Sequence, residues 1–397
     1  MSAPSATTSA SLTKGLLFLM AMAVAATAAN LYYNQPILPS IGLELGLSDG
    51  QLGYIPAASQ LGYAAAILLI SPLGDVLVRK KIIAILSLCL VVSSLVAFSS
   101  HHFVLLIVAC FGIGLSANIT QQLIPFAASM STAQEKGRVI GTLMTGLTVG
   151  ILLSRTLSGW VGELWGWRAV FLMSALIAAV FGVLLYRRLP HNTPPAALPY
   201  GQLLASMLTL VRQHTVLRQS ALTGALWFAA FNALWATLAL HVSKPPFGYD
   251  AHQAGLFGLV AMAGVIGAKV SGRLVPKLGA PMMINIALLL IASGFAVTYF
   301  YADQLVGLVI GIILIDLGVF SAQVSNQVRV FSIDPKAQSR INGVYMLGYY
   351  LGGAVGSYGG VQLFDQYGWS GVSGLAIALL AISALVNNLH RRQSGHD

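Results

Sequence analysis

The sequence predicts an all-α integral membrane protein of twelve transmembrane helices, arranged as two related six-helix halves. Of its 397 residues, 57% are hydrophobic and only 8% are charged, whereas a soluble domain carries roughly 25% charged residues. This number of charged residues is too small to cover the surface of a soluble protein of this length. Most of the surface must therefore face lipid. The apolar runs are continuous and about 20 residues long, as membrane-spanning helices require. A membrane barrel would instead show short alternating segments.

Twelve apolar runs give the expected helices. In the first half we expect them at residues 15–36, 51–72, 82–100, 103–130, 138–161 and 167–187. In the second half we expect them at residues 216–242, 252–275, 281–301, 304–331, 338–364 and 369–390.

The remaining segments divide the chain into domains. Residues 1–14 are rich in Ser, Ala and Thr and are expected to form a disordered cytoplasmic tail without a cleavable signal peptide. A cytoplasmic linker is expected at 190–215, because its Pro-rich start cannot stay helical. Within it, residues 200–214 carry apolar side chains at helical spacing and predict a short interfacial helix. The two six-helix bundles are then expected at 15–189 and 216–397.

Lys and Arg are distributed unevenly between the loops. One side of the expected membrane receives only Arg168 and Lys244, and the other receives nearly all the remaining basic residues. The positive-inside rule then places both termini in the cytoplasm, which we expect to be that of a bacterium with the chain in its inner membrane. The net charge of +10 is explained by this bias, so nucleic acid is not an expected partner. Cys89 and Cys110 lie in apolar runs and predict neither a disulfide nor a metal site.

The two halves match one another without a gap over about 50 residues when the first is shifted by 202. The matched pairs are Gln121 with Gln323, Arg138 with Arg340, Gly141 with Gly343, Met144 with Met346, Gly146 with Gly348, Gly150 with Gly352, and Gly166-Trp167 with Gly368-Trp369. A run that includes Trp, Arg and Gln exceeds chance glycine matches. Parallel six-helix repeats are the architecture of one large class of transporters.

The loop after the second expected helix, residues 71–81, carries a charged motif. Asp75, Arg79 and Lys80 match the loop motif of the major facilitator superfamily, which the whole chain resembles, although Ser71 and Val78 replace two of the motif's glycines. The resemblance implies two rocking bundles without a cofactor, and we expect a monomer. It also implies that the motif latches the cytoplasmic side.

The latch has a simple alternative. Asp75 can accept bonds from a neighbouring helix terminus or Arg, or it can be a solvated loop charge. We assign Arg138 and Arg340, which follow the corresponding loops in the two halves, to the same latch. A second copy of the loop motif at residues 272–277 lacks the Asp.

A narrower resemblance is to a bacterial branch of efflux-like permeases. It is carried by Asn30-Leu31-Tyr32-Tyr33-Asn34-Gln35-Pro36 in the first helix, and by residues 316–318, 325–327, 339–342 and 352–357. The Gly-Pro pair that drug–proton antiporters carry in the fifth helix is absent here. Gly150 is followed by Ile, and Arg155 stands nearby.

Asp316 is the only acid deep in an expected span. It lies about 12 residues into its helix, or roughly 18 Å at 1.5 Å per residue, which is mid-membrane. Gln323 and Gln327 follow on the same face. A carboxyl in such a cavity can load and release protons near neutral pH, so we interpret Asp316 as a proton-coupling or substrate-contact residue. The alternative is a structural Asp paired with a neighbouring helix.

Three basic residues also fall within expected spans. Arg155 lies about 17 residues into the fifth helix and can bind an anionic substrate group or pair with a carboxylate. The alternatives are bonds to backbone carbonyls or snorkelling to the membrane surface. For Lys269 and Arg329, near helix ends, snorkelling or gating is favoured over binding.

Polar and aromatic residues at helical spacing predict a substrate pocket along the helices that line the cavity in the resembled fold. Besides Arg155, Gln323 and Gln327, the predicted substrate-binding residues are Asn30, Tyr33, Asn34, Asn118, Gln121, Gln122, Trp227, Asn232, Trp235, Asn342, Tyr345 and Tyr349. For any one aromatic residue, core packing is the alternative.

Together these features predict a proton-coupled exporter of small amphipathic molecules that works by alternating access, with the lipid bilayer, protons and a small-molecule substrate as partners. The alternative is a proton-coupled symporter that takes up a small organic anion or another metabolite. An enzyme is not expected, because the eight histidines lie scattered in loops and ends, and no phosphate-binding loop or ATPase domain is present.

Overall fold

The computed structural model describes residues 12–132, 134–191, 199–334 and 337–389, so most of the expected tail and the start of the expected linker lie outside the described residues. Within the described residues every regular element is helical, which confirms the predicted all-α fold. In the part of the chain that the structure describes, ten helices are long and apolar enough to cross a membrane. The 51-residue α16 holds two of the expected spans, because Gly368 interrupts its helical conformation at φ 62° and ψ −152°.

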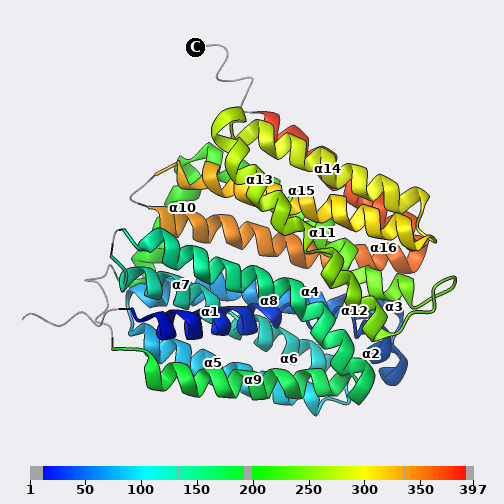
Figure 1. The fold of residues 1–397 in the computed structure, drawn as a ribbon, viewed down its shortest axis with the longest axis horizontal. Helices are drawn as coiled ribbons and strands as arrows, with labels where there is room; N and C mark the ends of the chain where they lie inside the picture. Colours follow the sequence, from blue (N-terminus) through cyan, green and yellow to red (C-terminus); the bar gives the residue numbers. More distant parts are fainter. Residues whose placement is uncertain (1–11, 133, 192–198, 335–336, 390–397) are drawn as a thin grey trace, which may run out of the picture.

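The helices follow the expected order along the chain (Figure 1). In the first half they are α1 Lys14–Ala29, α2 Leu38–Leu45, α3 Asp49–Leu52, α4 Tyr54–Leu69, the 3-10 helix η1 Ser71–Asp75, α5 Arg79–Phe98, α6 Phe103–Ser116, α7 Ile119–Ser129, α8 Lys136–Trp165 and α9 Trp167–Arg188. From the expected interfacial helix onward they are α10 Tyr200–Gln213, α11 Thr215–Val242, α12 Ala251–Val260, α13 Ala263–Leu278, α14 Ala280–Phe300, α15 Leu305–Phe331 and α16 Gln338–Asn388.

The first helix is shorter than predicted. It ends at Ala29 rather than residue 36, and the chain continues through turns into α2. A helix continued through Pro36 would need an N–H that proline lacks, and proline also disfavours helical geometry at Gln35. The periodicity that placed Asn30 and Asn34 on one helix face therefore does not apply beyond Ala29.

The expected fourth and eighth helices are each broken in the middle. Between α6 and α7, Asn118 N–H donates to the Leu115 carbonyl at 3.4 Å, three residues back. Between α12 and α13, Met262 N–H does the same to Leu259 at 3.2 Å. The backbone stays in the right-handed helical region at both turns, so Phe103–Ser129 and Ala251–Leu278 each still form one candidate membrane span.

Glycine positions of the sequence repeat make equivalent helix contacts in the two halves. A Cβ added to Gly150 on α8 would lie 2.2 Å from the Ala25 carbonyl oxygen of α1. A Cβ added to Gly352 on α16 would lie 2.2 Å from the Ala225 carbonyl oxygen of α11. Both helix pairs thus pack backbone to backbone, as small residues allow in membranes.

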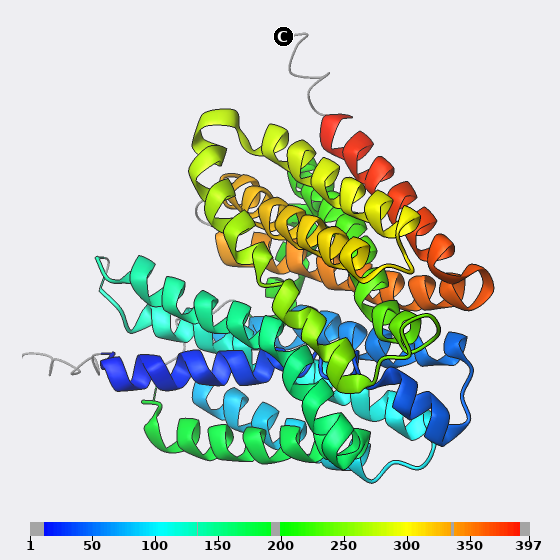
Figure 2. The same cartoon turned by 45° about the vertical axis from the view of Figure 1, so that its right-hand side comes forward.

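Figure 2 shows the helices of residues 14–188 below and those of residues 263–388 above. We call the end at which α1 and α5 begin the basic end, and the opposite end the far end. The halves meet where α4 packs on α16 and α8 packs on α12. Near the far end, the hydroxyls of Tyr54 and Tyr358 lie 3.3 Å apart, and Thr156 donates to the Gly255 carbonyl at 3.0 Å.

Candidate functional site

An aromatic cluster lies between the halves. Phe228 on α11 stacks on Tyr349 of α16, with ring centroids 3.6 Å apart, and Trp227 meets Tyr349 edge-on at 5.0 Å. The next residue, Tyr350, contacts Tyr63 on α4 at 4.4 Å. All five side chains are buried, so the cluster continues from the second half into the first. Trp227 and Tyr349 are predicted site residues, whereas the other three are not.

The repeated glutamines each bond a tyrosine. Gln121 on α7 donates to the Tyr63 hydroxyl at 3.1 Å. Gln323 on α15 accepts from the Tyr345 hydroxyl at 2.9 Å. Both glutamines are half-buried. The structure therefore joins three predicted residues, Gln121, Gln323 and Tyr345, to the same aromatic region. In the first half this connection runs through Tyr63, which contacts both Gln121 and Tyr350.

Two neighbouring residues of α4 form hydrogen bonds with asparagine side chains of other segments. Ser59 accepts a hydrogen bond from the Asn34 side chain at 3.1 Å. Gln60 donates across the halves to Asn232 of α11 at 3.1 Å. The amide oxygens of the two donating side chains, Asn34 Oδ1 and Gln60 Oε1, are buried and have no hydrogen-bond partner among the described residues. They remain available to accept a hydrogen bond from a ligand.

Arg155 is enclosed at the centre with 1% of its surface exposed. Its Nε donates to Gln35 Oε1 at 2.7 Å, and its Nη1 reaches the Ile151 carbonyl at 3.5 Å. The guanidinium lies over the rings of Trp235 and Tyr32, 3.9 Å and 4.9 Å from their centroids, a favourable cation–π arrangement. Arg155 therefore does not snorkel to the membrane surface. Its Nη2 and the Gln35 Nε2 are buried donors without a partner among the described residues.

Asp316 on α15 is fully buried. Neither of its carboxylate oxygens has a hydrogen-bond partner among the described residues. Asp316 and Arg155 form no ion pair within 4.0 Å in the described chain. An ionised carboxylate without a hydrogen bond or an ion pair is costly to bury. The alternative of a structural Asp bonded to a neighbouring helix finds no such bond here.

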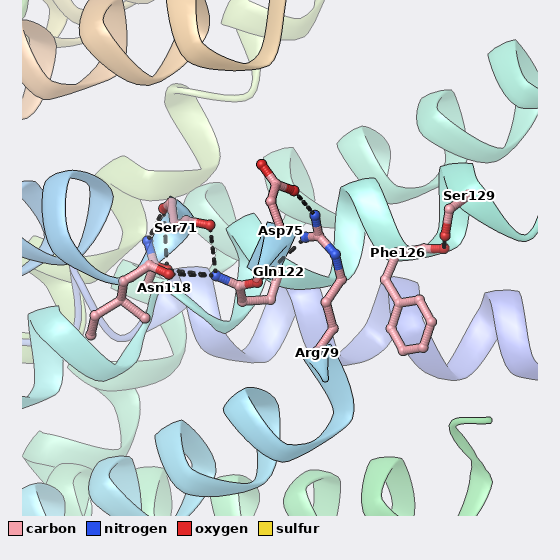
Figure 3. A network of polar contacts seen from close by, with 8 residues as sticks. Ser71, Asp75, Arg79, Asn118, Gln122, Phe126 and Ser129 are labelled. Carbon is pink, nitrogen blue, oxygen red and sulfur yellow. Dashed lines mark hydrogen bonds and ion pairs between the residues drawn. The ribbon is translucent and has the colours of Figure 1, made fainter. Parts of the chain in front are cut away.

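A polar network surrounds the loop motif at the basic end (Figure 3). Arg79 pairs with Asp75 at 2.8 Å and also donates to Gln122 at 3.4 Å. Asn118 and Ser71 exchange hydrogen bonds at 3.0 Å and 3.3 Å. Asn118 and Gln122 are predicted substrate contacts, but the structure places them with the motif and not in the aromatic cluster.

The other predicted latch residues lie apart from this network. Lys80 donates to the Leu189 carbonyl at 2.8 Å and lies over the Tyr186 ring. Arg138 is exposed and Arg340 is half-buried. Neither forms an ion pair with a described residue.

The remaining predicted site residues are dispersed. Asn30 bonds the Ala26 carbonyl and accepts from Ser174 of α9, inside the first bundle. Tyr33 is buried. Gln327 and Asn342 are half-buried on α15 and α16.

The structure adds contacts that the sequence analysis does not assign, chiefly Tyr32, Gln35, Gln60, Tyr63 and Tyr350. Tyr32 and Gln35 belong to the first-helix motif. The predicted helix ran to residue 36, whereas α1 ends at Ala29, so the helix faces assigned to these residues were wrong. Among the described residues, no group of three or more His, Cys, Asp or Glu could hold a metal ion.

Comparisons with known proteins agree with this fold. The sequence model of the Major Facilitator Superfamily matches residues 18–357. The chain is 35% identical to an uncharacterised transporter, YgaY, of Escherichia coli O157:H7 over 387 residues, which cover 97% of this chain and 98% of that protein. It is 24% identical to the multi-drug resistance efflux pump PmrA of Streptococcus pneumoniae, over 92% of this chain and 93% of the pump.

A similar solved structure is that of a bacterial homologue of the human lysosomal transporter Spinster, in an inward-facing and occupied conformation. It superposes with a TM-score of 0.78 at 14% sequence identity and covers 95% of this chain and 96% of that one. At this identity the likeness shows the shared fold alone.

Proposed function

The chain belongs to the major facilitator superfamily of membrane transporters, and on that premise we propose that it is a proton-coupled exporter of small amphipathic molecules. It is a multi-pass membrane protein and a transporter rather than an enzyme. We place it in a bacterial inner membrane as a monomer, with both termini in the cytoplasm and with the bundles divided at the linker of residues 190–215.

Asp316 carries the proposal. It is the only buried Asp or Glu among the described residues, and both of its oxygens lack partners. A proton on Asp316 removes the cost of a buried charge when the centre is closed. Opening the centre to water lets that proton leave. The acid can therefore couple the inward-to-outward cycle to a proton gradient.

The aromatic cluster and its surroundings support an amphipathic substrate and a cytosolic entry. Aromatic rings supply apolar contact area, and unpartnered groups such as Gln60 Oε1 supply a few polar contacts. The halves meet through contacts such as Tyr54–Tyr358 at the far end, whereas Gln121, Gln323 and Gln327 toward the basic end are partly exposed. This pattern fits a cavity that opens toward the cytoplasm, and the similarity to an efflux pump favours export.

The test needs a ligand first. Thermal-shift screening of the purified protein against lipophilic amines, phenols and carboxylates supplies one, and its transport is then measured in liposomes under an imposed pH gradient. Asp316→Asn is expected to abolish gradient-driven transport while leaving exchange of the same ligand across the membrane measurable. Asp303→Asn, an exposed acid just before the same helix, is the matched control. Undiminished coupled transport by Asp316→Asn would refute the role of this acid.

Uptake of a small organic anion by proton symport is the second candidate. The observation that favours it is the pair of buried donors without partners, Arg155 Nη2 and Gln35 Nε2, which match a carboxylate. Arg155→Gln is then expected to raise the half-saturating concentration of a carboxylate ligand by at least about tenfold, since a charge-assisted bond is lost. For a neutral amphipathic ligand the value should change little. Equal behaviour of both ligand classes would exclude anion recognition by Arg155.

A further inference from the structure

A hollow of about 490 Å³ opens at the basic end of the second half, between α13, α14 and α15. This volume lies within the roughly 300–1,000 Å³ range of small-molecule sites. Its lining includes Gly272, Pro276, Pro281, Val328, Arg329 and Ser332. Most of the lining is apolar, and Val328 together with the nearby Met282 belongs to the exposed, lipid-facing surface of these helices. The hollow is separate from the central aromatic cluster.

Arg329 is the one charged side chain in this lining. It is 8% exposed, and its guanidinium donates to the neutral amide oxygens of Asn387 at 3.0 Å and Gln219 at 3.2 Å. No carboxylate of the described chain pairs with it. These amides hold the guanidinium in place but do not compensate its charge. A guanidinium has five N–H donors, so donors remain for a further acceptor.

The equivalent region of the first half is built differently. There Asp75 neutralises Arg79 within the loop motif, and Gln122 fills the adjacent space so closely that a Cβ on Gly74 would lie 2.3 Å from its side-chain oxygen. The second copy of the motif, at residues 272–277, has no Asp. A Cβ on Gly272 would meet nothing within 4 Å. The second half therefore lacks the ion pair of the first motif and has open space beside Gly272, and the buried Arg329 of α15 lines the same hollow.

We propose that this hollow binds the phosphate group of an anionic phospholipid, with Arg329 as the anchor. The exposed Arg273 and Lys277 flank Gly272 and Pro276 along α13 and add positive potential. Basic pockets between helices at the cytoplasmic side of a membrane suit anionic headgroups. The apolar lining accommodates the start of the acyl chains, which distinguishes a lipid from a free phosphate ion.

Lipid-dependent thermal unfolding tests the proposal. Purified protein in phosphatidylcholine-containing micelles is titrated with phosphatidylglycerol or cardiolipin, with additional phosphatidylcholine and inorganic phosphate as separate arms. The wild-type protein should be stabilised by the anionic lipids only. In Arg329→Gln the half-maximal lipid concentration should rise by at least about tenfold, because the charge-assisted bonds to phosphate are lost. Arg273→Gln, an exposed basic residue beside the hollow, should shift it far less.

A second variant keeps the test independent of the Arg329 hydrogen bonds to α11 and α16. An added Cβ at Gly272 meets nothing within 4 Å, and leucine improves helix propensity, so Gly272→Leu, which places a bulky side chain in the hollow, should keep or raise basal stability and still lose the lipid response. The proposal is overturned if phosphatidylcholine or inorganic phosphate stabilises the wild-type protein as well as the anionic lipids do. It is equally overturned if Gly272→Leu, or a folded Arg329→Gln, responds to the anionic lipids like the wild type.

Discussion

The two halves share a scaffold but carry different charges at equivalent positions. The counterpart of Asp316 in the first half is Gly114, whose added Cβ would lie 1.9 Å from the Ser59 carbonyl oxygen, so no acid fits there. The counterpart of Arg155 in the second half is Ser357, which is buried and has no partner among the described residues. At the centre, the first half thus contributes the buried cation Arg155 and the second half the buried acid Asp316, while the buried Arg329 of the second half lies at the basic end.

Because the two buried charges belong to different halves, a rocking motion of one half against the other would change their relative position. In the proposed rocking motion, Arg155 moves with the first half and Asp316 with the second, and no ion pair joins the two groups in the described chain. Rotation of one half against the other changes both their separation and their access to water. In the proposed cycle, the loading of Asp316 with a proton depends on the conformational state, as proton coupling requires.

The scaffold shared by the two halves can be tested at Gly150 and Gly352, which make the same helix contacts in each half. Gly150→Leu and Gly352→Leu should each destabilise the protein by at least about 3 kcal/mol, because the new side chain overlaps the backbone of α1 or α11. The measurement is the yield of monodisperse protein in fluorescence-detected size-exclusion chromatography, followed by thermal unfolding. This is the largest effect expected here, and it should be of similar size in both halves.

Gly141→Leu is the matched control on α8, because an added Cβ there meets nothing within 4 Å. It should express and unfold like the wild type. If Gly150→Leu is tolerated while Gly352→Leu is not, the two halves do not depend on the same helix packing, and the structural repeat is weaker than the sequence repeat.

Most of the fold could be predicted from the sequence, because long apolar runs and loop charges report directly on membrane spans. The breaks within spans could not. The turns at Asn118 and Met262 leave apolar runs uninterrupted, so hydropathy gives no signal for them. The end of α1 was detectable in principle, since Pro36 disfavours a helix that includes Gln35.

The site was predicted in part. Asp316 and Arg155 stand out because a charge in an apolar run is rare. Helical periodicity assigned both Gln121 and Gln122 to the substrate pocket, whereas in the structure Gln121 contacts Tyr63 of the aromatic cluster and Gln122 faces the loop motif. Tyr63 and Tyr350 carry no such signal, because an aromatic residue in a membrane helix is ordinary and only tertiary packing brings these two together across the halves.

The smallest expected effect concerns the repeated Gly-Trp pair at the far end. Trp167 donates to Glu44 at 2.7 Å, and Arg168 pairs with the same carboxylate. Trp369 has no hydrogen-bond partner for its indole N–H among the described residues, and it lies against the His241 ring at 4.5 Å. The halves therefore differ: the first holds its Trp against a carboxylate that is paired with Arg168, and the second packs its Trp against an imidazole ring.

Glu44→Gln sharpens this difference. The hydrogen bond from Arg168 is the main cause that holds the pKa of Glu44 below its usual value. A carboxyl with a lowered pKa in the folded state stabilises it above the unfolded-state value, about 4.3 for Glu, and this contribution disappears as pH falls through the folded-state pKa. Because the pair is exposed, the expected loss is below about 1 kcal/mol.

At pH 7 the unfolding temperature of Glu44→Gln should therefore be slightly lower than that of the wild type. The difference between the two unfolding temperatures should disappear between pH 5 and pH 3. Glu163→Gln, an exposed glutamate at the same end without a described ion pair, should show no such closing difference. A Glu44→Gln difference that stays constant over this range would mean that the pairing with Arg168 contributes nothing, and that Glu44 acts only as an acceptor for the indole of Trp167.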